Sequence, residues 1–231
     1  MDTDQVDPDN AGRDSTAPLH WTGLSAAGVR LAWIVLGSIF VIDVVLQLLA
    51  ALDMGRPALG ESRSLLGMWD LAKAITIGTV LIYIAGRTRW RPIATLGVLF
   101  VIVGIEDQIA IHGELGSAIA GLLRFEAWIP GIGGYGAVHL GEFLAMGLFG
   151  IVAFVLIWTG SPAPDRTLSR VRTVVTVLLV AMFFFAGVVD LLTAAERSLT
   201  TMLVEELGER GVLSLSAVYA ISLARTYPAD G

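Results

Sequence analysis

The run AVHLGEFLAMGLFGIVAFVLIW at residues 137–158 decides the fold class of this chain. A helix that crosses a bilayer needs about 20 mostly apolar residues, and this run supplies them. Its two ionisable residues, His139 and Glu142, stand three positions apart, so both can face one point on a helix. The sequence therefore predicts a membrane span over about 137–159, with polar groups near its first residue.

Outward from this run, four further apolar runs predict spans over about 29–52, 65–86, 92–113 and 170–194. Residues 199–224 are acidic in their first half and apolar in their second. They predict a sixth span whose acids point into the bundle, or alternatively an amphipathic helix lying on the membrane. The 231 residues are 55% hydrophobic and 16% charged, against about 25% charged in soluble domains. We therefore expect an all-α integral membrane bundle of six transmembrane helices.

The remaining segments are short. Residues 1–24 are polar and predict a disordered cytoplasmic tail, residues 25–225 a single six-helix membrane domain, and residues 226–231 a short C-terminal tail. Residues 114–136 are glycine-rich and join two spans. Within them, residues 116–127 favour a short helix along the membrane interface, where Trp128 and Tyr135 suit the headgroup level.

The arginines in the loops predict the orientation, because basic residues are enriched in cytoplasmic loops. With six spans, nine arginines lie on the side that holds both termini and four on the other. The nine are Arg13, Arg30, Arg87, Arg89, Arg91, Arg166, Arg170, Arg172 and Arg225, and the four are Arg56, Arg63, Arg124 and Arg197. This count predicts a multi-pass protein of the cell membrane with both termini in the cytoplasm.

Several classes of function are excluded by composition. The chain has no cysteine, so it has neither disulfides nor thiolate metal sites. Its net charge is −6 and no basic patch indicates nucleic acid. The stretch PGIGGYG at 130–136 has no Lys, Ser or Thr at phosphate-loop spacing, which argues against a nucleotide site.

The ionisable residues within the spans gather toward the non-cytoplasmic side, while the cytoplasmic halves carry almost none. Such groups are expensive in hydrocarbon and mark a functional site. Asp43 lies near the middle of its span. The others are Asp70, Lys73, Glu106, Asp107, His112, Glu114, His139, Glu142, Asp190, Glu205, Glu206 and Glu209.

Helical spacing predicts how some of these side chains are arranged. Asp70 and Lys73 stand at i, i+3 and predict an internal ion pair. On one continuous helix, His112 would share a face with Gln108, and Glu106 would point to a different face. Asp43 is expected to join a network or to bond a neighbouring helix.

The leading hypothesis is a divalent metal site of a membrane-embedded protein, because imidazole and carboxylate suit Zn, Fe or Mn. Its predicted ligands are Asp107, His112, His139, Glu142, Glu205 and Glu206. Four-helix di-metal proteins use Glu-x-x-His, whereas the order here is His139-x-x-Glu142, so the likeness is one of ligand types. Such a metal would activate water or an oxidant for a lipid-like substrate, although the sequence leaves open whether the protein is an enzyme.

Two alternatives remain open. The first is a proton- or cation-coupled transporter or channel component. It would move protons or a small cation past Asp43, Asp70, Lys73 and Asp107. The cytoplasmic halves of the predicted spans are apolar, which argues against a polar route to both faces of the membrane. The second is a structural subunit whose buried ion pairs only fix helix packing. Haem is disfavoured, because the two histidines lie near the outer surface and no second pair exists.

Three motifs resemble a signature of multi-pass bacterial membrane proteins to which no activity is assigned. They are GIEDQIAIHGEL at 104–115, WIPG at 128–131 and VEELGERG at 204–211. The matching acidic and histidine positions are Glu106, Asp107 and His112 in the first motif and Glu205, Glu206 and Glu209 in the last. Gly113 separates His112 from Glu114, where the signature has the two residues adjacent. The resemblance implies a shared polar site and a sixth helix that belongs to the fold.

Overall fold

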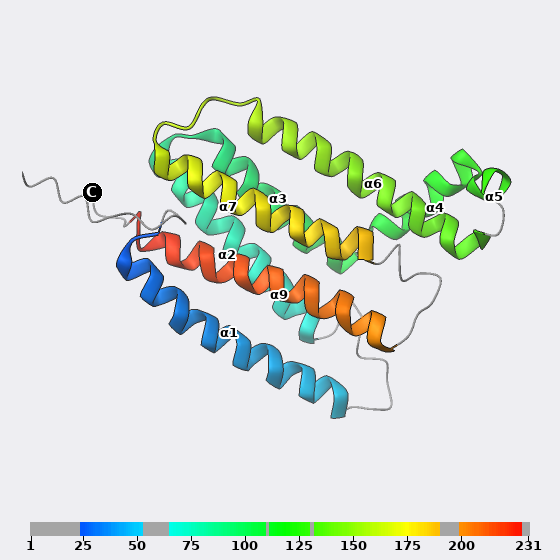
Figure 1. The fold of residues 1–231 in the computed structure, drawn as a ribbon, viewed down its shortest axis with the longest axis horizontal. Coiled ribbons are helices and arrows are strands. Elements are labelled where there is room, and N and C mark those ends of the chain that lie inside the picture. Colours follow the sequence, from blue (N-terminus) through cyan, green and yellow to red (C-terminus); the bar gives the residue numbers. More distant parts are fainter. Residues whose placement is uncertain (1–23, 53–64, 110, 130–131, 190–198, 228–231) are drawn as a thin grey trace, which may run out of the picture.

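The computed structural model describes residues 24–52, 65–109, 111–129, 132–189 and 199–227. In these residues every regular element is a helix and none is a strand (Figure 1). The helices in chain order are α1 (Ala26–Leu52), α2 (Leu65–Thr88), α3 (Arg91–Ile109), α4 (Ile111–Leu123), α5 (Phe125–Trp128), α6 (Gly133–Trp158), α7 (Arg166–Phe183), the π-helix η2 (Phe184–Val189) and α9 (Leu199–Ala224). The predicted all-α fold is confirmed.

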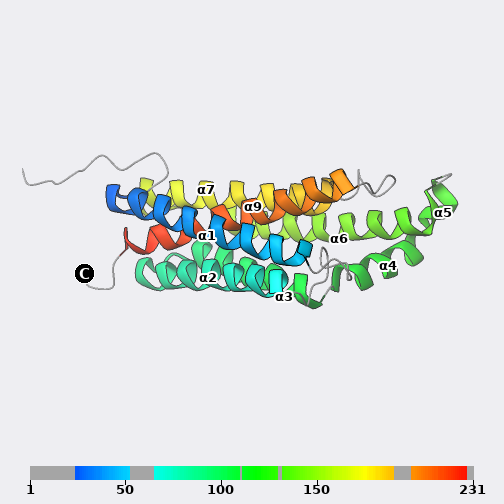
Figure 2. The ribbon, with the colours of Figure 1, turned by 90° about the horizontal axis from the view of Figure 1, so that it is seen from below.

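Five of the described segments are long and apolar enough to cross a membrane: α1, α2, α3, α6, and α7 together with η2. The helix α9 packs against α1, α2 and α7 within the same bundle (Figures 1 and 2). Its second half is buried, and includes Ala217, Val218, Ala220 and Leu223. This packing agrees with the prediction of a sixth helix.

The helix boundaries differ from the predicted spans at two places. The span predicted over 92–113 divides, because α3 ends at Ile109 and α4 begins at Ile111. His112 and Glu114 therefore belong to α4. The helix α6 begins at Gly133, about one turn earlier than predicted. Asp190 and residues 1–23 of the predicted tail lie outside the described residues.

The short helix predicted over 116–127 is present as α4 followed by α5. Arg124 separates them with a left-handed backbone (φ 50°), which ends α4 and redirects the chain. Trp128 and Tyr135 are 79% and 52% exposed, and their predicted position at the headgroup level stays a prediction. The helices α4 and α5 extend past the ends of α2 and α3 (Figure 2).

The first and last few described residues of the helical unit pack against the bundle and contact each other. Leu24, which the sequence places in the N-terminal tail, is only 4% exposed. The backbone N–H of Ser25 donates to Thr226 Oγ1 at 3.2 Å, across the ends of the described chain. The packed unit therefore includes Leu24 and Thr226.

The apolar core occupies the half of the bundle that includes the α2–α3 and α6–α7 connections; we call this the arginine end. Fully buried side chains there come from α2, α3, α7 and α9, and include Leu81, Ile84, Ile93, Leu96, Phe100, Leu168, Val171 and Leu223. The buried hydroxyls of Ser216 and Ser222 donate to carbonyls of their own helix. Among the described residues, the interior of this half is filled mainly by apolar side chains, and its arginines lie in or near the connections.

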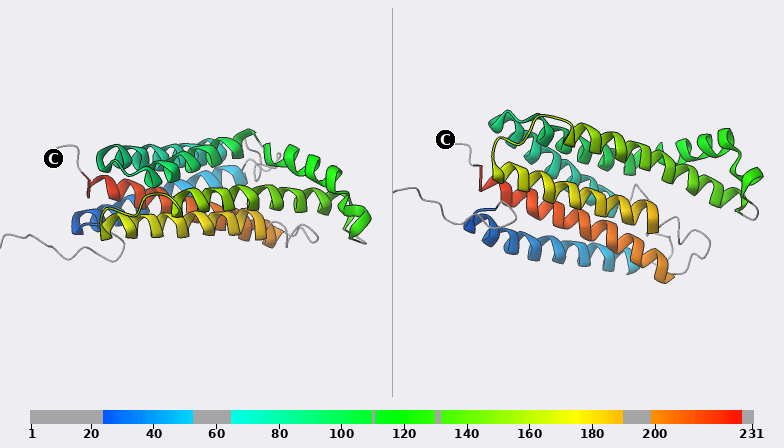
Figure 3. Two further views of the ribbon diagram at one scale, coloured as in Figure 1. Left: turned by 90° about the horizontal axis from the view of Figure 1, so that it is seen from above. Right: turned by 45° about the horizontal axis from the view of Figure 1, so that its top comes forward.

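Glycines allow two pairs of helices to approach closely. In α2 and α3, a Cβ built on Gly78 would lie 2.7 Å from the carbonyl oxygen of Gly97, and a Cβ on Gly97 equally near that of Gly78. In α4 and α6, a Cβ on Gly141 would collide with the Gly116 carbonyl. Small residues serve this purpose in membrane bundles. Both views in Figure 3 show α4 and α6 running side by side.

Candidate functional site

The most buried polar cluster joins α1, α2 and α9, and we call it the lysine network. Its centre is Lys73, the only lysine in the sequence, whose side chain is 2% exposed. Lys73 Nζ lies 3.2 Å from Asp43 Oδ1 and donates to Ser214 Oγ at 3.1 Å. Ser214 Oγ in turn donates to Asp43 Oδ2 at 2.7 Å, so one carboxylate binds both groups.

Asp70 forms the second half of the lysine network. Asp70 Oδ1 lies 2.6 Å from Lys73 Nζ, which confirms the ion pair predicted from the i, i+3 spacing. Arg210 Nε donates to Asp70 Oδ2 at 3.1 Å from α9. The side chains of Asp43, Asp70 and Arg210 are 17%, 12% and 13% exposed. Two carboxylates and two cations are thus paired, as burial of charge requires.

Helical spacing brings these groups to one junction. On α2, Trp69 and Lys73 stand one turn apart, and Trp69 Nε1 donates to Asp43 Oδ1 at 2.6 Å. On α9, Arg210 and Ser214 are also one turn apart. Asp43 therefore joins a network through neighbouring helices, as the sequence predicts. Trp69, Arg210 and Ser214 were not predicted as members.

A first histidine–carboxylate pair lies where α3 ends and α4 begins. His112 Nδ1 lies 2.6 Å from Glu106 Oε1, and the backbone N–H of His112 donates to the same oxygen at 2.8 Å. The first N–H groups of a helix lack intrahelical acceptors, and Glu106 satisfies one of them in α4. This hydrogen bond raises the pKa of His112 above its ordinary value, while burial opposes the rise.

The prediction that Glu106 points away from His112 is therefore wrong. It assumed one continuous helix over 92–113, whereas the chain changes helix after Ile109. The same change removes the predicted face shared by Gln108 and His112, and Gln108 Nε2 donates to Asp107 Oδ2 at 3.3 Å instead.

A second pair, on α6, faces α4. His139 Nδ1 lies 2.8 Å from Glu142 Oε2, as the i, i+3 spacing allows. The ring of Tyr135 packs edge-on against that of His139, with centroids 4.2 Å apart. Glu142 Oε1 lies 3.5 Å from the position that a Cβ on Gly113 would occupy. Glu142 is also within electrostatic range of His112.

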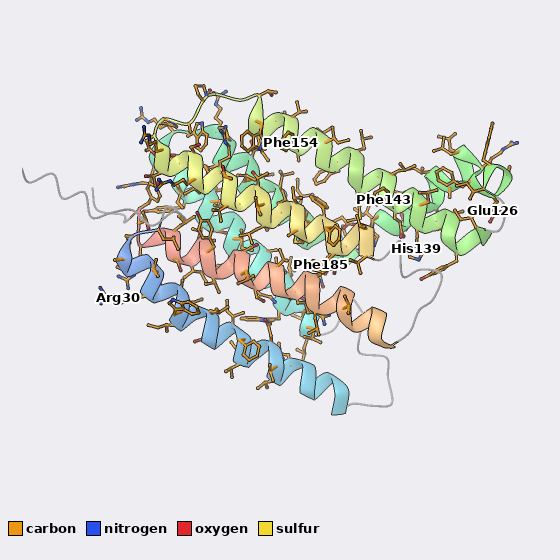
Figure 4. The ribbon with its side chains drawn as sticks, viewed as in Figure 1. Arg30, Glu126, His139, Phe143, Phe154 and Phe185 are labelled. Atoms are coloured by element: carbon orange, nitrogen blue, oxygen red, sulfur yellow. The ribbon has the colours of Figure 1, made fainter. Side chains whose placement is uncertain are left out.

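Glu142 therefore lies between the two histidines, at the end of the bundle opposite the arginine end; we call it the histidine end. Figure 4 labels His139 there and Arg30 at the other end. A cavity of about 550 Å³ lies among α4, α5 and α6, lined in part by Arg124, Glu126 and Val138. Val138, one of its lining residues, directly precedes His139.

The predicted metal ligands are only partly brought together. Asp107 is exposed, and it lies within electrostatic range of Asp70 and His112. The side chains of Glu205 and Glu206 lie outside the described residues. In the part of the chain that the structure describes, no three His, Asp or Glu side chains form a group that could hold a metal ion. The histidines instead form two separate pairs, His112 with Glu106 and His139 with Glu142.

One signal in the sequence pointed to the lysine network. Lys73 and Arg210 are the two basic residues set well inside the predicted spans. Two cations within hydrocarbon require two anions nearby, a rule that would have assigned Asp43 and Asp70 as partners of Lys73 and Arg210, although the prediction paired only Asp70 with Lys73. The i, i+3 spacing identified the Asp70–Lys73 contact, whereas the contacts of α9 join residues 140 or more positions apart.

Comparisons with known proteins identify no relative: no family model matches the chain, and neither a curated protein nor a solved structure is similar to it. The resemblance of residues 104–115, 128–131 and 204–211 to a signature of multi-pass membrane proteins stays a prediction.

Proposed function

We propose that this chain is a component of proton- or cation-coupled transport, in which a proton taken up at the histidine end changes the packing of α1, α2 and α9. The observation that carries the proposal is Lys73, which is buried between Asp43 and Asp70. Relays of Asp, Glu and His mark proton paths in membrane transporters.

Titratable groups extend from the surface at the histidine end into the lysine network. The side chains of His112 and Glu106 are 36% and 29% exposed. Asp107 follows, and it lies within electrostatic range of Asp70. Asp70 contacts Lys73, and Lys73 contacts Asp43. Exposure thus falls from the exposed Asp107 to 12% at Asp70 and 2% at Lys73, so a proton would enter at the surface groups His112, Glu106 and Asp107.

Protonation would act on the helix packing through charge. A proton on a carboxylate oxygen of Asp70 removes one negative charge and weakens the contacts of Asp70 with Lys73 and Arg210. Loss of one charge from a buried ion-pair network is destabilising. The network would respond by moving α9 relative to α2, because Arg210 and Ser214 attach α9 to it.

The apolar packing at the arginine end accords with alternating access. A transporter exposes its central site to one side at a time, by rocking one group of helices against another. In the conformation described, the titratable groups lie toward the histidine end and the arginine half is filled by apolar side chains. The proposal therefore requires a second conformation in which this half separates.

The proposal is tested by proton movement in vesicles that contain the purified protein and a trapped pH-sensitive dye. A pH gradient is imposed with Na⁺, K⁺ or Mg²⁺ as the accompanying ion in turn. We expect proton movement above that of protein-free vesicles with at least one ion. We expect Asp70→Asn to lower its rate at least tenfold and Glu114→Gln, an exposed acid in α4, to leave it unchanged.

Circular dichroism and size-exclusion profiles of the Asp70→Asn protein establish that the variant folds. The proposal would be contradicted if native protein moved no protons with any of the three ions. Equal rates for native protein and a folded Asp70→Asn variant would contradict it as well.

We propose the divalent metal site as a second candidate, because Glu142 lies between His112 and His139. Imidazole and carboxylate ligands suit Zn, Fe or Mn. The paired side chains would have to turn toward a common ion, with a further ligand such as Asp107. A metal at this depth would suit a lipid-like substrate that enters from the bilayer.

Elemental analysis of the purified protein, with an optical spectrum of the same sample, tests this second candidate. We expect a stoichiometric transition metal that is lost in the His112→Ala, His139→Ala double variant and retained in His20→Ala, which removes the third histidine of the chain. Unchanged metal content in the double variant would contradict the ligand assignment, and no metal after reconstitution would leave the lysine network as the site.

A further inference from the structure

Two tryptophans join the connections at the arginine end. Trp90 lies in the α2–α3 turn, is 3% exposed, and its Nε1 donates to the backbone oxygen of Ser161 at 3.0 Å. Trp158 is the last residue of α6. The neighbouring Arg89 adopts a left-handed backbone (φ 53°), which turns the chain so that Trp90 can reach Ser161. The α2–α3 turn and the α6–α7 connection are thus held together.

Arg172 of α7 is held by these two rings. Its guanidinium carbon lies 4.1 Å from the Trp158 ring centroid and 5.5 Å from that of Trp90. Both distances are within the range of cation–π attraction. Its Nε is buried and has no hydrogen-bond acceptor among the described residues. The rings fix the plane of the guanidinium but accept none of its five N–H donors by ordinary hydrogen bonds.

The surroundings of Arg172 are strongly positive. Five further arginines lie in or beside the same two connections: Arg87, Arg89, Arg91, Arg166 and Arg170. The acid of the described α6–α7 connection is Asp165, whose Oδ1 accepts the backbone N–H of Leu168 at 2.7 Å and so caps α7. In the described residues in or beside these two connections, six arginines thus stand against the single acid Asp165, and an external anion would be attracted.

An exposed apolar strip continues from Arg172 along α6. The ring of Phe154 stacks on that of Trp158, with centroids 5.7 Å apart. Phe154 and Leu156 are 51% and 56% exposed. Figure 4 labels Phe154 on the outer side of α6 near this end. A ligand with a phosphate at Arg172 and a hydrocarbon chain along α6 would satisfy both features, whereas free phosphate would leave the strip uncovered.

We propose that Arg172, Trp90 and Trp158 form a binding site for an anionic phospholipid of the adjoining leaflet, with the lipid phosphate on the guanidinium and an acyl chain along Trp158 and Phe154. Arg172 lies six positions after the first residue of α7, or roughly 9 Å along the helix at about 1.5 Å per residue. This depth suits a phosphate group, and tryptophans are enriched at that level. Basic pockets between membrane helices bind phosphorylated head groups.

The test measures lipid binding to the purified full chain in detergent by native mass spectrometry. We expect phosphatidylglycerol to bind more tightly than phosphatidylcholine of the same acyl chains. In Arg172→Gln we expect about fivefold weaker binding of phosphatidylglycerol, since one arginine near a lipid surface contributes about that factor. Arg225→Gln, which removes an exposed arginine at the same end, should bind phosphatidylglycerol as the native protein does.

Three results would overturn the proposal. They are equal binding of the two lipids by native protein, unchanged binding in Arg172→Gln, and displacement of phosphatidylglycerol by millimolar inorganic phosphate, which would make this a phosphate site. The comparison of phosphatidylglycerol with phosphatidylcholine uses native protein alone. It therefore tests the proposal even if the Arg172→Gln variant fails to fold. Phe154→Ala should weaken the binding of long-chain more than of short-chain phosphatidylglycerol, and equal effects would contradict the assigned position of the acyl chain.

Discussion

The pair formed by His112 and Glu106 makes the stability of the junction between α3 and α4 depend on pH. The hydrogen bond to Glu106 raises the pKa of His112 in the folded protein, relative to an ordinary value near about 6.5. The other charged groups that act on His112 are Asp107 of α3 and Glu142 of α6. A raised pKa means that folding stabilises the protonated ring.

The resulting prediction compares native protein with His112→Gln across pH. The stabilisation is fully present below the unfolded pKa of about 6.5 and is lost as the pH rises through the higher folded pKa. We therefore expect native protein to melt at a higher temperature than the variant near about pH 5.5 and the difference to vanish at about pH 9. The effect should be modest, since the His112 side chain is 36% exposed and solvent screens it.

Thermal melts in detergent at both pH values provide the measurement, with His20→Gln as the matched control. A difference in melting temperature that stays constant from acid to alkaline pH would show that the ring contributes through packing and not through its charge.

At the scale of residues, the predictions succeeded where both partners stand on one continuous helix. The contact of Asp70 with Lys73 and that of His139 with Glu142 follow from i, i+3 spacing, which fixes a shared face. The contact of Glu106 with His112 could not be found in this way. It depends on a change of helix after Ile109, and residues 105–112 contain no proline or glycine that would indicate such a change.

The pairing of α4 with α6 depends on backbone contact between helices. Gly116 and Gly141 meet with no side chain between them, and Glu142 packs against the same part of α4. Close approach of this kind strengthens van der Waals contact, the main force between helices in a bilayer. A methyl group on Gly141 would clash with the carbonyl oxygen of Gly116.

We accordingly expect Gly141→Ala to destabilise the protein by about 1–3 kcal/mol, the usual cost of overpacking. Gly147→Ala on the same helix is the control, because a Cβ there meets nothing within 4 Å. It should leave stability unchanged or raise it slightly, since alanine favours helix over glycine by about 1 kcal/mol.

Unfolding in a series of detergent mixtures measures the change in the free energy of unfolding for Gly141→Ala and for Gly147→Ala. If Gly141→Ala proved no less stable than Gly147→Ala, the crossing would not be as tight as the backbone distances indicate.

Sequence patterns predicted most elements but not their exact ends. Apolar runs identified the five helices that are long enough to cross a membrane, because length and hydropathy are local properties. The start of α6 at Gly133 was missed, since three glycines at 133, 134 and 136 argue against a helix. Packing of this first turn on α4 and α5 outweighs that local preference.

For the whole molecule, the two ends of the bundle should face opposite compartments. The arginine end is predicted to be cytoplasmic by the distribution of Arg residues. Because the native chain has no cysteine, a single introduced thiol reports one position without background. Ser161 at the arginine end and Ala127 at the histidine end are both exposed and suit this purpose.

In intact cells we expect a membrane-impermeant thiol reagent to label Ala127→Cys and to leave Ser161→Cys unlabelled until the membrane is permeabilised. The native protein, treated in parallel, controls for labelling of other proteins. The reverse pattern would invert the predicted orientation and place both termini outside the cytoplasm.

The gathering of the acids and histidines of the spans toward one end was predictable, because alternating spans convert sequence position into position along the bundle. The junction of α1, α2 and α9 was not. Ser214 and Asp43 are separated by 171 positions, and no local pattern indicates which helices become neighbours over such a distance. The composition of the lysine network thus required the tertiary structure, while the position of its residues along the helices followed from the sequence.

The charge balance of the lysine network has an electrical consequence. Asp43, Asp70, Lys73 and Arg210 sum to zero when all four are ionised, so a membrane potential exerts no net force on them as a unit. A single added proton gives the unit one positive charge, and an elementary charge that crosses the full potential gains about 2.3 kcal/mol per 100 mV. In the vesicle assay, a potassium diffusion potential should therefore shift the pH dependence of proton movement. The voltage across the membrane would then exert a net force on this network only after a proton has arrived.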